Sequence, residues 1–167
     1  NLSKDLWLSD AVDIIDYGCG QGLGIICFAD YLQEAHKSIH VRRIVLIDPS
    51  VVALKRAALH ASVLFPDTEL VTINKGFDDL LSEDIFSEKD LTTLHILSNV
   101  LDLARPSDSD GSYDLAGFAN LISTSIEGKN QFVGVEPLFN HSITDKKFPR
   151  FWKQVGISID YKLICNK

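Results

Sequence analysis

Four glycines at alternate positions, from Gly18 to Gly24, directly follow the apolar run 12–17 (VDIIDY). Glycine lets a backbone pass close to a ligand, and the amide groups at the start of a following helix favour negative charge or hydrogen-bond acceptors. The pattern therefore predicts a ligand-binding loop between a strand and a helix. The alternative is a tight turn that needs glycine only for its dihedral angles, for which one or two glycines would be enough.

The spacing of these glycines does not fit the common phosphate-binding loops. A dinucleotide-binding loop reads G-x-G-x-x-G, and counting from Gly18 or Gly20 puts Leu23 or Ile25 at its last glycine position. A P-loop needs a lysine after its glycines, and no lysine follows here. The remaining pattern is two apolar residues and an acidic residue, Asp16, followed after one further residue by G-x-G-x-G.

Residues 14–22 (IIDYGCGQG) resemble the glycine motif of the class I S-adenosylmethionine-dependent methyltransferases. That family binds its methyl donor over this loop, in a seven-stranded doubly wound sheet, and the resemblance extends over nearly the whole chain. It implies S-adenosyl-L-methionine as the cofactor and S-adenosyl-L-homocysteine as the product. The loop residues that it places against the donor are Asp16, Tyr17, Gly18, Cys19, Gly20 and Gly22.

An acidic residue, Asp48, ends the second apolar run, 43–48 (RIVLID). A carboxylate at a strand end can accept hydrogen bonds from the two neighbouring hydroxyls of a ribose. The resemblance gives Asp48 this role. Pro49 stands where the family often has another apolar side chain, and its ring can still pack on the adenine. The alternative is a cap for the helix that begins near Ser50, and the position at the strand end favours the ribose role.

Two further strand ends carry candidate donor contacts by resemblance. After the third strand, Phe77 would cover a face of the adenine and Asp78 would accept from its amine, although Asp78 or Asp79 can equally cap a helix at Leu80. After the fourth strand, Ser98 and Asn99 would lie beside the donor and the acceptor. The Asn-Pro-Pro-aromatic motif of methyltransferases that act on amide or adenine nitrogens is absent, and the acceptor stays unidentified.

No single residue is predicted to be catalytic. Methyl transfer from a sulfonium is a direct displacement, in which the protein mostly positions the reactants and a general base is needed only if the acceptor loses a proton. His95 lies in the middle of a predicted strand, which favours a buried core histidine over a base. Glu136 is either a substrate contact or a solvated carboxylate. The other histidines lack metal-ligand spacing, so no metal is predicted.

One basic and aromatic cluster lies near the end of the chain. Its charged members can contact a substrate or nucleic acid, but an amphipathic helix with aromatic residues in the core is favoured. The cluster consists of Lys146, Lys147, Phe148, Arg150, Phe151, Trp152 and Lys153.

Apolar runs alternate with amphipathic stretches, which predicts strands joined by helices in an α/β fold. We expect a doubly wound, mainly parallel sheet of about six strands, with helices on both faces and without the last strand of the family's sheet. The predicted strands are 12–17, 43–48, 69–74, 92–98, 131–135 and 157–164. The predicted helices are 22–35, 50–65, 80–86, 113–126 and 148–155.

The 167 residues, with 46% apolar composition, predict a single domain, residues 1–167. The net charge of −7 argues against a general nucleic-acid-binding surface, but a nucleic-acid substrate stays open. Three cysteines without a CxxC pair, and the absence of a membrane-length apolar run or a signal peptide, predict a cytoplasmic protein that does not span a membrane. The missing N-terminal Met predicts a core cut from a longer chain.

The sequence therefore favours a methyltransferase domain that transfers a methyl group from S-adenosylmethionine to an unidentified acceptor. A non-catalytic binding or scaffold module with the same fold is the alternative. An NAD-dependent oxidoreductase is a third hypothesis, which the failed dinucleotide spacing disfavours.

Overall fold

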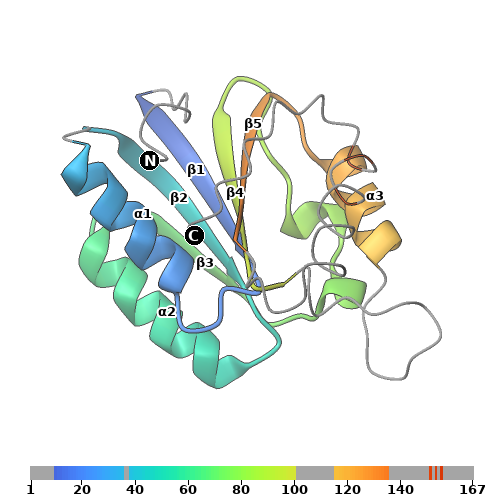
Figure 1. Ribbon diagram of the computed structural model, residues 1–167, viewed down its shortest axis with the longest axis horizontal. Coiled ribbons are helices and arrows are strands. Elements are labelled where there is room, and N and C mark those ends of the chain that lie inside the picture. The colour runs from blue at the N-terminus through green and yellow to red at the C-terminus, as the bar shows by residue number, and fades with distance from the viewer. Residues whose placement is uncertain are drawn as a thin grey trace, which may run out of the picture.

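The computed structural model describes residues 10–35, 38–100 and 115–135, together with Phe151, Lys153 and Val155. Within these residues the chain forms a five-stranded sheet in the order β3-β2-β1-β4-β5, and neighbouring strands are parallel (Figure 1). The strands are β1 (Ala11–Tyr17), β2 (His40–Ile47), β3 (Glu69–Ile73), β4 (Thr92–Ser98) and β5 (Lys129–Val135).

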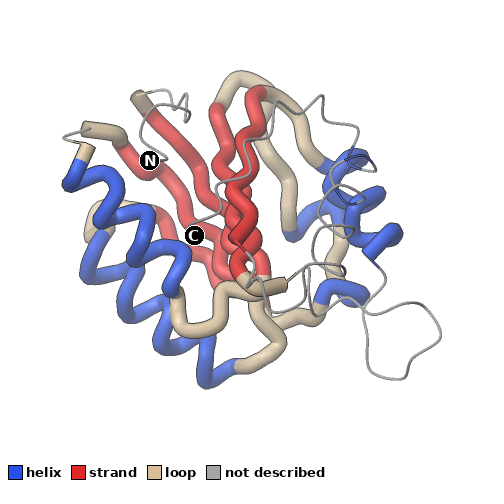
Figure 2. The backbone as a smooth tube through the Cα atoms, in the orientation of Figure 1, coloured by secondary structure: helices blue, strands red, loops and turns tan. Residues whose placement is uncertain are grey.

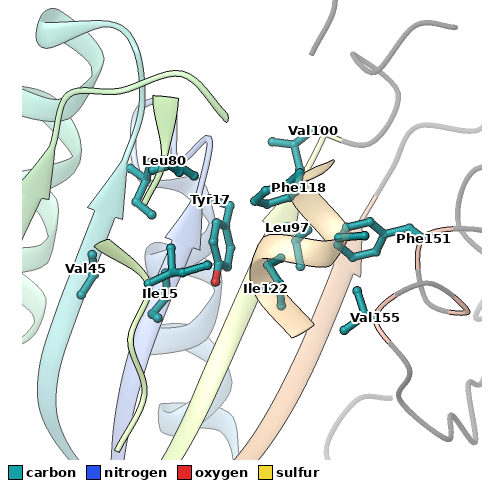
Figure 3. Close-up of a cluster of buried hydrophobic side chains, with 13 residues drawn as sticks. Ile15, Tyr17, Val45, Leu80, Leu97, Val100, Phe118, Ile122, Phe151 and Val155 are labelled. Atoms are coloured by element: carbon teal, nitrogen blue, oxygen red, sulfur yellow. The ribbon is translucent and has the colours of Figure 1, made fainter. Parts of the chain in front are cut away.

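Helices cover both faces of the sheet, as Figure 2 shows. The helices α1 (Leu23–Glu34) and α2 (Val51–Leu64) lie side by side on one face, and α3 (Leu115–Ser125) lies on the other. Successive residues of a strand point to opposite faces. Accordingly, Ile14 packs in the core beneath α1 and α2, whereas Ile15 packs in the core beneath α3 (Figure 3). The predicted doubly wound α/β fold is thus confirmed.

The strand order reverses at the centre of the sheet. The chain runs outward from β1 through β2 to β3 and then crosses to β4 on the other side of β1. In open sheets of this kind, ligands bind at the carboxyl ends of the strands where the order reverses. The turns that follow β1, β2 and β4 are therefore the first place to look for a site.

The prediction of a helix over 80–86 is wrong. The segment contains a short 3-10 turn, η3 (Ser82–Asp84), after an earlier one, η2 (Phe77–Asp79). Both Leu80 and Ile85 are buried against the sheet, and these positions lie about 140° apart around a helix, so one helical face cannot bury both. The Lys75 ammonium instead pairs with the Asp84 carboxylate at 2.7 Å and fixes the turn.

The other element predictions differ from the structure mainly at their ends. The second and fifth strands begin earlier than predicted, at His40 and Lys129, and α3 ends at Ser125. The predicted strand 157–164 lies outside the described residues. Of the predicted helix 148–155, the three described residues have helical backbones. No helix within the described ranges is long and apolar enough to cross a membrane.

Candidate functional site

The glycine loop, residues 18–22, connects β1 to α1 at the carboxyl edge of the sheet. Gly18, Gly20 and Gly22 have φ angles of 60°, 53° and 86°, in the left-handed region that other residues rarely adopt. Gly24 lies in α1, where a Cβ would be 2.9 Å from Asp16 Oδ2. Backbone geometry thus explains all four glycines, and the case for a ligand rests on the acidic residues around the loop.

Asp48 lies directly after β2, buried beside the glycine loop. Its Oδ2 accepts a hydrogen bond from the Gly20 N–H at 2.9 Å, and its Oδ1 accepts one from the Ser50 N–H at 2.8 Å. The cap of α2 is Ser50, whose hydroxyl accepts from Ala53, so Asp48 shapes the turn and is not the cap. Each carboxylate oxygen can accept more than one hydrogen bond, which leaves acceptor capacity for a ligand.

Asp16 is fully buried between the sheet and the start of α1. Neither of its carboxyl oxygens has a hydrogen-bond partner among the described residues. Burial, and secondarily the negative charge of Asp48, raise the pKa of Asp16 to about 8. Two acidic groups therefore lie next to the loop, and Asp16 is mostly protonated near neutral pH, because no partner among the described residues stabilises its charged form.

The side chains of Tyr17 and Cys19 are buried in the core and anchor the start of the glycine loop there. The Tyr17 ring packs against Phe118 of α3, at 5.4 Å between ring centroids (Figure 3). The Tyr17 hydroxyl bonds to His95 Nδ1 at 3.0 Å. Burial raises the pKa of the Cys19 thiol, which keeps this thiol protonated and unreactive. The side chain of Tyr17 thus points into the core, and only its backbone faces the edge where a donor would lie.

Phe77 and Asp78 form part of η2, directly beside the loop. The Phe77 ring lies 3.3 Å from the point where a Cβ on Gly18 would be, and it contacts Phe118 at 4.6 Å between ring centroids. Both Phe77 and Asp78 line a cleft of about 250 Å³, whose other lining residues are Leu80, Gly117, Phe118 and Leu121. No helix begins at Leu80, so the alternative role of Asp78 or Asp79 as a helix cap there is excluded.

The end of β4 also approaches the glycine loop. Ser98 is half-buried, and Asn99 has a φ of 58°, a left-handed conformation that asparagine tolerates. This turn is fixed by the Asn99 N–H, which donates to the Val135 carbonyl at 2.7 Å. It brings the Val100 side chain to 2.5 Å from the Cβ position of Gly18. Sequence reasoning missed Val100, because its only signal is an apolar residue beyond a strand end.

Pro49 lies in the exposed turn between β2 and α2. Its carbonyl accepts a hydrogen bond from the Asn74 side-chain amide at 2.8 Å, and the same amide donates to the Asp48 carbonyl at 3.0 Å. The turn is thus fixed to the end of β3. The structure therefore gathers Asp16, Asp48, Pro49, Phe77, Asp78, Ser98 and Asn99 along one edge of the sheet, around the glycine loop.

His95 is a core residue, as the sequence favoured. Its Nδ1 bonds to the Tyr17 hydroxyl, and its Nε2 bonds to Asn130 Oδ1 at 2.9 Å. Burial lowers the pKa of His95 to about 4, so the ring is neutral at physiological pH. The alternative role as a catalytic base is not supported, because the ring is completely buried and both nitrogens are engaged.

The remaining candidates lie mostly outside the described residues. This holds for Glu136 and for all of the basic and aromatic cluster except Phe151 and Lys153. Phe151 is buried 5.8 Å from the Phe118 ring, whereas Lys153 is exposed, as expected of an amphipathic helix. No group of His, Cys, Asp or Glu in the described part of the chain could hold a metal ion.

No protein-family model and no curated protein sequence matches this chain. Solved structures match its fold. One is a candidate methyltransferase in complex with the Haloferax volcanii Trm112 methyltransferase activator, with a TM-score of 0.57 and 12% identity over 92% of this chain and 65% of that chain. Another is the small RNA methyltransferase HEN1, with a TM-score of 0.57 and 16% identity over 89% of this chain and 20% of that chain.

A third match is the DszA carbon methyltransferase, with a TM-score of 0.52 and 14% identity over 93% of this chain and 34% of that chain. This chain therefore spans less than two thirds of each of these three proteins. At such low identity the likeness concerns the fold: the chain has the fold of the class I S-adenosylmethionine-dependent methyltransferases.

Proposed function

We propose that this chain is a methyltransferase domain that binds S-adenosylmethionine over its glycine loop. The observation that carries the proposal is the pair of acidic residues, Asp16 and Asp48, buried beside a loop that lacks the spacing of a phosphate-binding motif. A buried carboxylate without a partner is costly, and a cationic ligand relieves that cost. S-adenosylmethionine has a sulfonium centre and no phosphate.

The acidic character of the site favours this donor over dinucleotides. A ribose contact from Asp48 would suit NAD as well as S-adenosylmethionine, so it does not separate the two ligands. Asp16 does, because a positively charged ligand would stabilise its ionised form and lower its raised pKa, whereas a pyrophosphate would destabilise that form. The same reasoning disfavours a nucleoside triphosphate, whose binding loop also requires a lysine.

Each candidate residue would have a distinct task. Asp48 would accept from the ribose hydroxyls, while Phe77 and Asp78 would contact the adenine. Asp16 would ionise beneath the loop when the positively charged donor binds, and Ser98 and Asn99 would lie beside the reacting group. When bound, the cofactor supplies a methyl group on a positively charged sulfur, which a nucleophile takes by direct displacement to leave S-adenosylhomocysteine. The chain's contribution is then mainly position and orientation.

The acceptor is not identified by this site. The names of the matched proteins give different acceptors. One is a small RNA methyltransferase, and another is a carbon methyltransferase. One matched methyltransferase is in complex with an activator protein, which supports a protein partner for this chain as part of the proposal. A nucleic-acid acceptor stays open.

A non-catalytic module with the same fold is the second candidate. The observation in its favour is that Val100 and Phe77 lie close over Gly18, where a donor would approach the loop. In addition, the histidine of β4, His95, is completely buried with both ring nitrogens engaged, so it cannot serve as a general base. A module of this kind would show no donor binding, or binding without methyl transfer.

Titration calorimetry of the purified, folded chain tests the proposal. S-adenosylhomocysteine is expected to bind, whereas NAD and ATP at the same concentrations are expected not to bind. A folded chain that gives no binding heat with S-adenosylhomocysteine at several temperatures would contradict the proposal. Binding of NAD in its place would restore the oxidoreductase hypothesis.

A further inference from the structure

The glycine loop is attached to the unit formed by β2 and α2 at consecutive residues. The Cys19 N–H donates to the Ile47 carbonyl at 2.9 Å. The next N–H, that of Gly20, donates to the Asp48 carboxylate at 2.9 Å. Both acceptors lie at the end of β2 or directly after it, so these two hydrogen bonds fix the position of the first half of the loop relative to β2.

The second half of the loop rests on α2. Gly22 packs so closely on this helix that a Cβ would be 3.0 Å from the Ala57 Cα. One helical turn further along, His60 Nδ1 lies 2.9 Å from the Gln21 carbonyl oxygen. Residues three apart in a helix share a face, so Ala57 and His60 both face the loop. Sequence reasoning gave no role to His60.

The tautomer of His60 follows from this contact. A carbonyl oxygen only accepts, so Nδ1 must carry a proton and donate it to Gln21. The ring is partly buried at the end of the helix face that also holds Ala57. Besides the Cys19 thiol, which belongs to the loop itself and donates to the Gly20 carbonyl at 3.7 Å, the His60 ring contacts a backbone carbonyl of the glycine loop from a separate element, α2.

We propose that His60 is a positioning residue for the glycine loop, which holds the loop in its donor-binding shape through the Gln21 carbonyl. The inference rests on the proposed function, because the loop is taken to bind S-adenosylmethionine. Gln21 lies between two glycines with left-handed φ angles, and glycine has the largest conformational freedom of any residue. A hydrogen bond at this point restricts the loop before the ligand binds, which lowers the entropy cost of binding.

The test compares two substitutions at His60. In His60→Leu the donor is lost while the apolar bulk stays. In His60→Asn the side-chain amide places an N–H at the same number of bonds from the backbone as Nδ1. His40→Leu is the matched control, since His40 is exposed at the start of β2, at the other end of the sheet.

Affinity for S-adenosylhomocysteine and the melting temperature are measured for all four proteins. Because one hydrogen bond is lost, we expect His60→Leu to weaken binding about five- to ten-fold. His60→Asn and His40→Leu should stay within about two-fold of the wild type. The melting temperatures of His60→Leu and His40→Leu should agree. Wild-type affinity in His60→Leu, or an equal loss in His60→Asn, overturns the proposal.

Hydrogen exchange of the ligand-free chain separates this inference from the proposed function. Faster exchange of the amides at residues 19–24 in His60→Leu, but not in His60→Asn or His40→Leu, supports the positioning role even if the wild type binds no S-adenosylhomocysteine. Unchanged exchange in His60→Leu contradicts the role. Absence of binding by the wild type contradicts only the proposed function.

Discussion

Replacing Asp48 with alanine is expected to weaken binding of S-adenosylhomocysteine at least about 100-fold. Each carboxylate oxygen of Asp48 already accepts one backbone N–H, from Gly20 at 2.9 Å and from Ser50 at 2.8 Å, and keeps capacity for one ribose hydroxyl. Hydrogen bonds to a charged group contribute about 1.5–3 kcal/mol each. Loss of two such bonds costs about 3–6 kcal/mol, or roughly 100-fold to 10,000-fold in affinity.

The assay is titration calorimetry with S-adenosylhomocysteine and with its 2′-deoxy analogue. The wild type should bind the analogue more weakly than the parent ligand, whereas Asp48→Ala should bind both with similar affinity, because the partner of the hydroxyl is gone. Asp67→Ala is the matched control, since Asp67 is exposed in the turn between α2 and β3. Unchanged affinity in Asp48→Ala, or an equal deoxy penalty in both proteins, would refute the ribose role.

Three further predictions concern stability, each measured by urea or thermal unfolding. Because Asp16 keeps its proton in the folded chain up to about pH 8 but loses it near 3.8 when unfolded, the free energy of unfolding should fall by about 1.4 kcal/mol per pH unit as pH rises between these values. His95, with a pKa of about 4 when folded and 6.5 when unfolded, adds an opposite slope between those two values, so the fall should be visible between pH 6.5 and 8 and be absent in Asp16→Asn. Equal slopes in both proteins contradict this. Gly22→Ala should destabilise more than Gly20→Ala, because both are strained by their φ angles but only the first meets the α2 backbone, at 3.0 Å. The reverse order of melting temperatures argues against the packing of the loop on α2. Tyr17→Phe should cost about 1–3 kcal/mol, because it leaves a buried histidine nitrogen without a donor. An unchanged melting temperature would show that this hydrogen bond contributes nothing.

The strands could be predicted from the sequence because a sheet covered on both faces requires continuous apolar runs. The strand over 92–98 has the predicted bounds, and the burial of nearly all its residues explains why its pattern was clear. The segment 80–86 could not be predicted in the same way. Its apolar residues Leu80 and Ile85 are each buried directly after a separate 3-10 turn, and their spacing follows from packing against the folded sheet.

The candidate site could be predicted to the extent that topology alone determines it. Parallel strands place their carboxyl ends on one edge, so Asp48 and Asn99 had to lie near the glycine loop. The direction of the Tyr17 side chain could also be predicted, because side chains alternate along a strand. Tyr17 lies on the same face as Ile15, so its side chain points away from Asp16. His60 could not be found this way, since its contact with Gln21 joins residues 39 positions apart through the packing of a helix.

A crystal structure of the chain with S-adenosylhomocysteine tests the central claim most directly. The account predicts the ligand over the glycine loop, with its ribose hydroxyls within hydrogen-bond distance of Asp48 and its adenine beside Phe77 and Asp78. Crystals grown at saturating ligand that show it elsewhere on the chain, or not bound at all, would contradict the account.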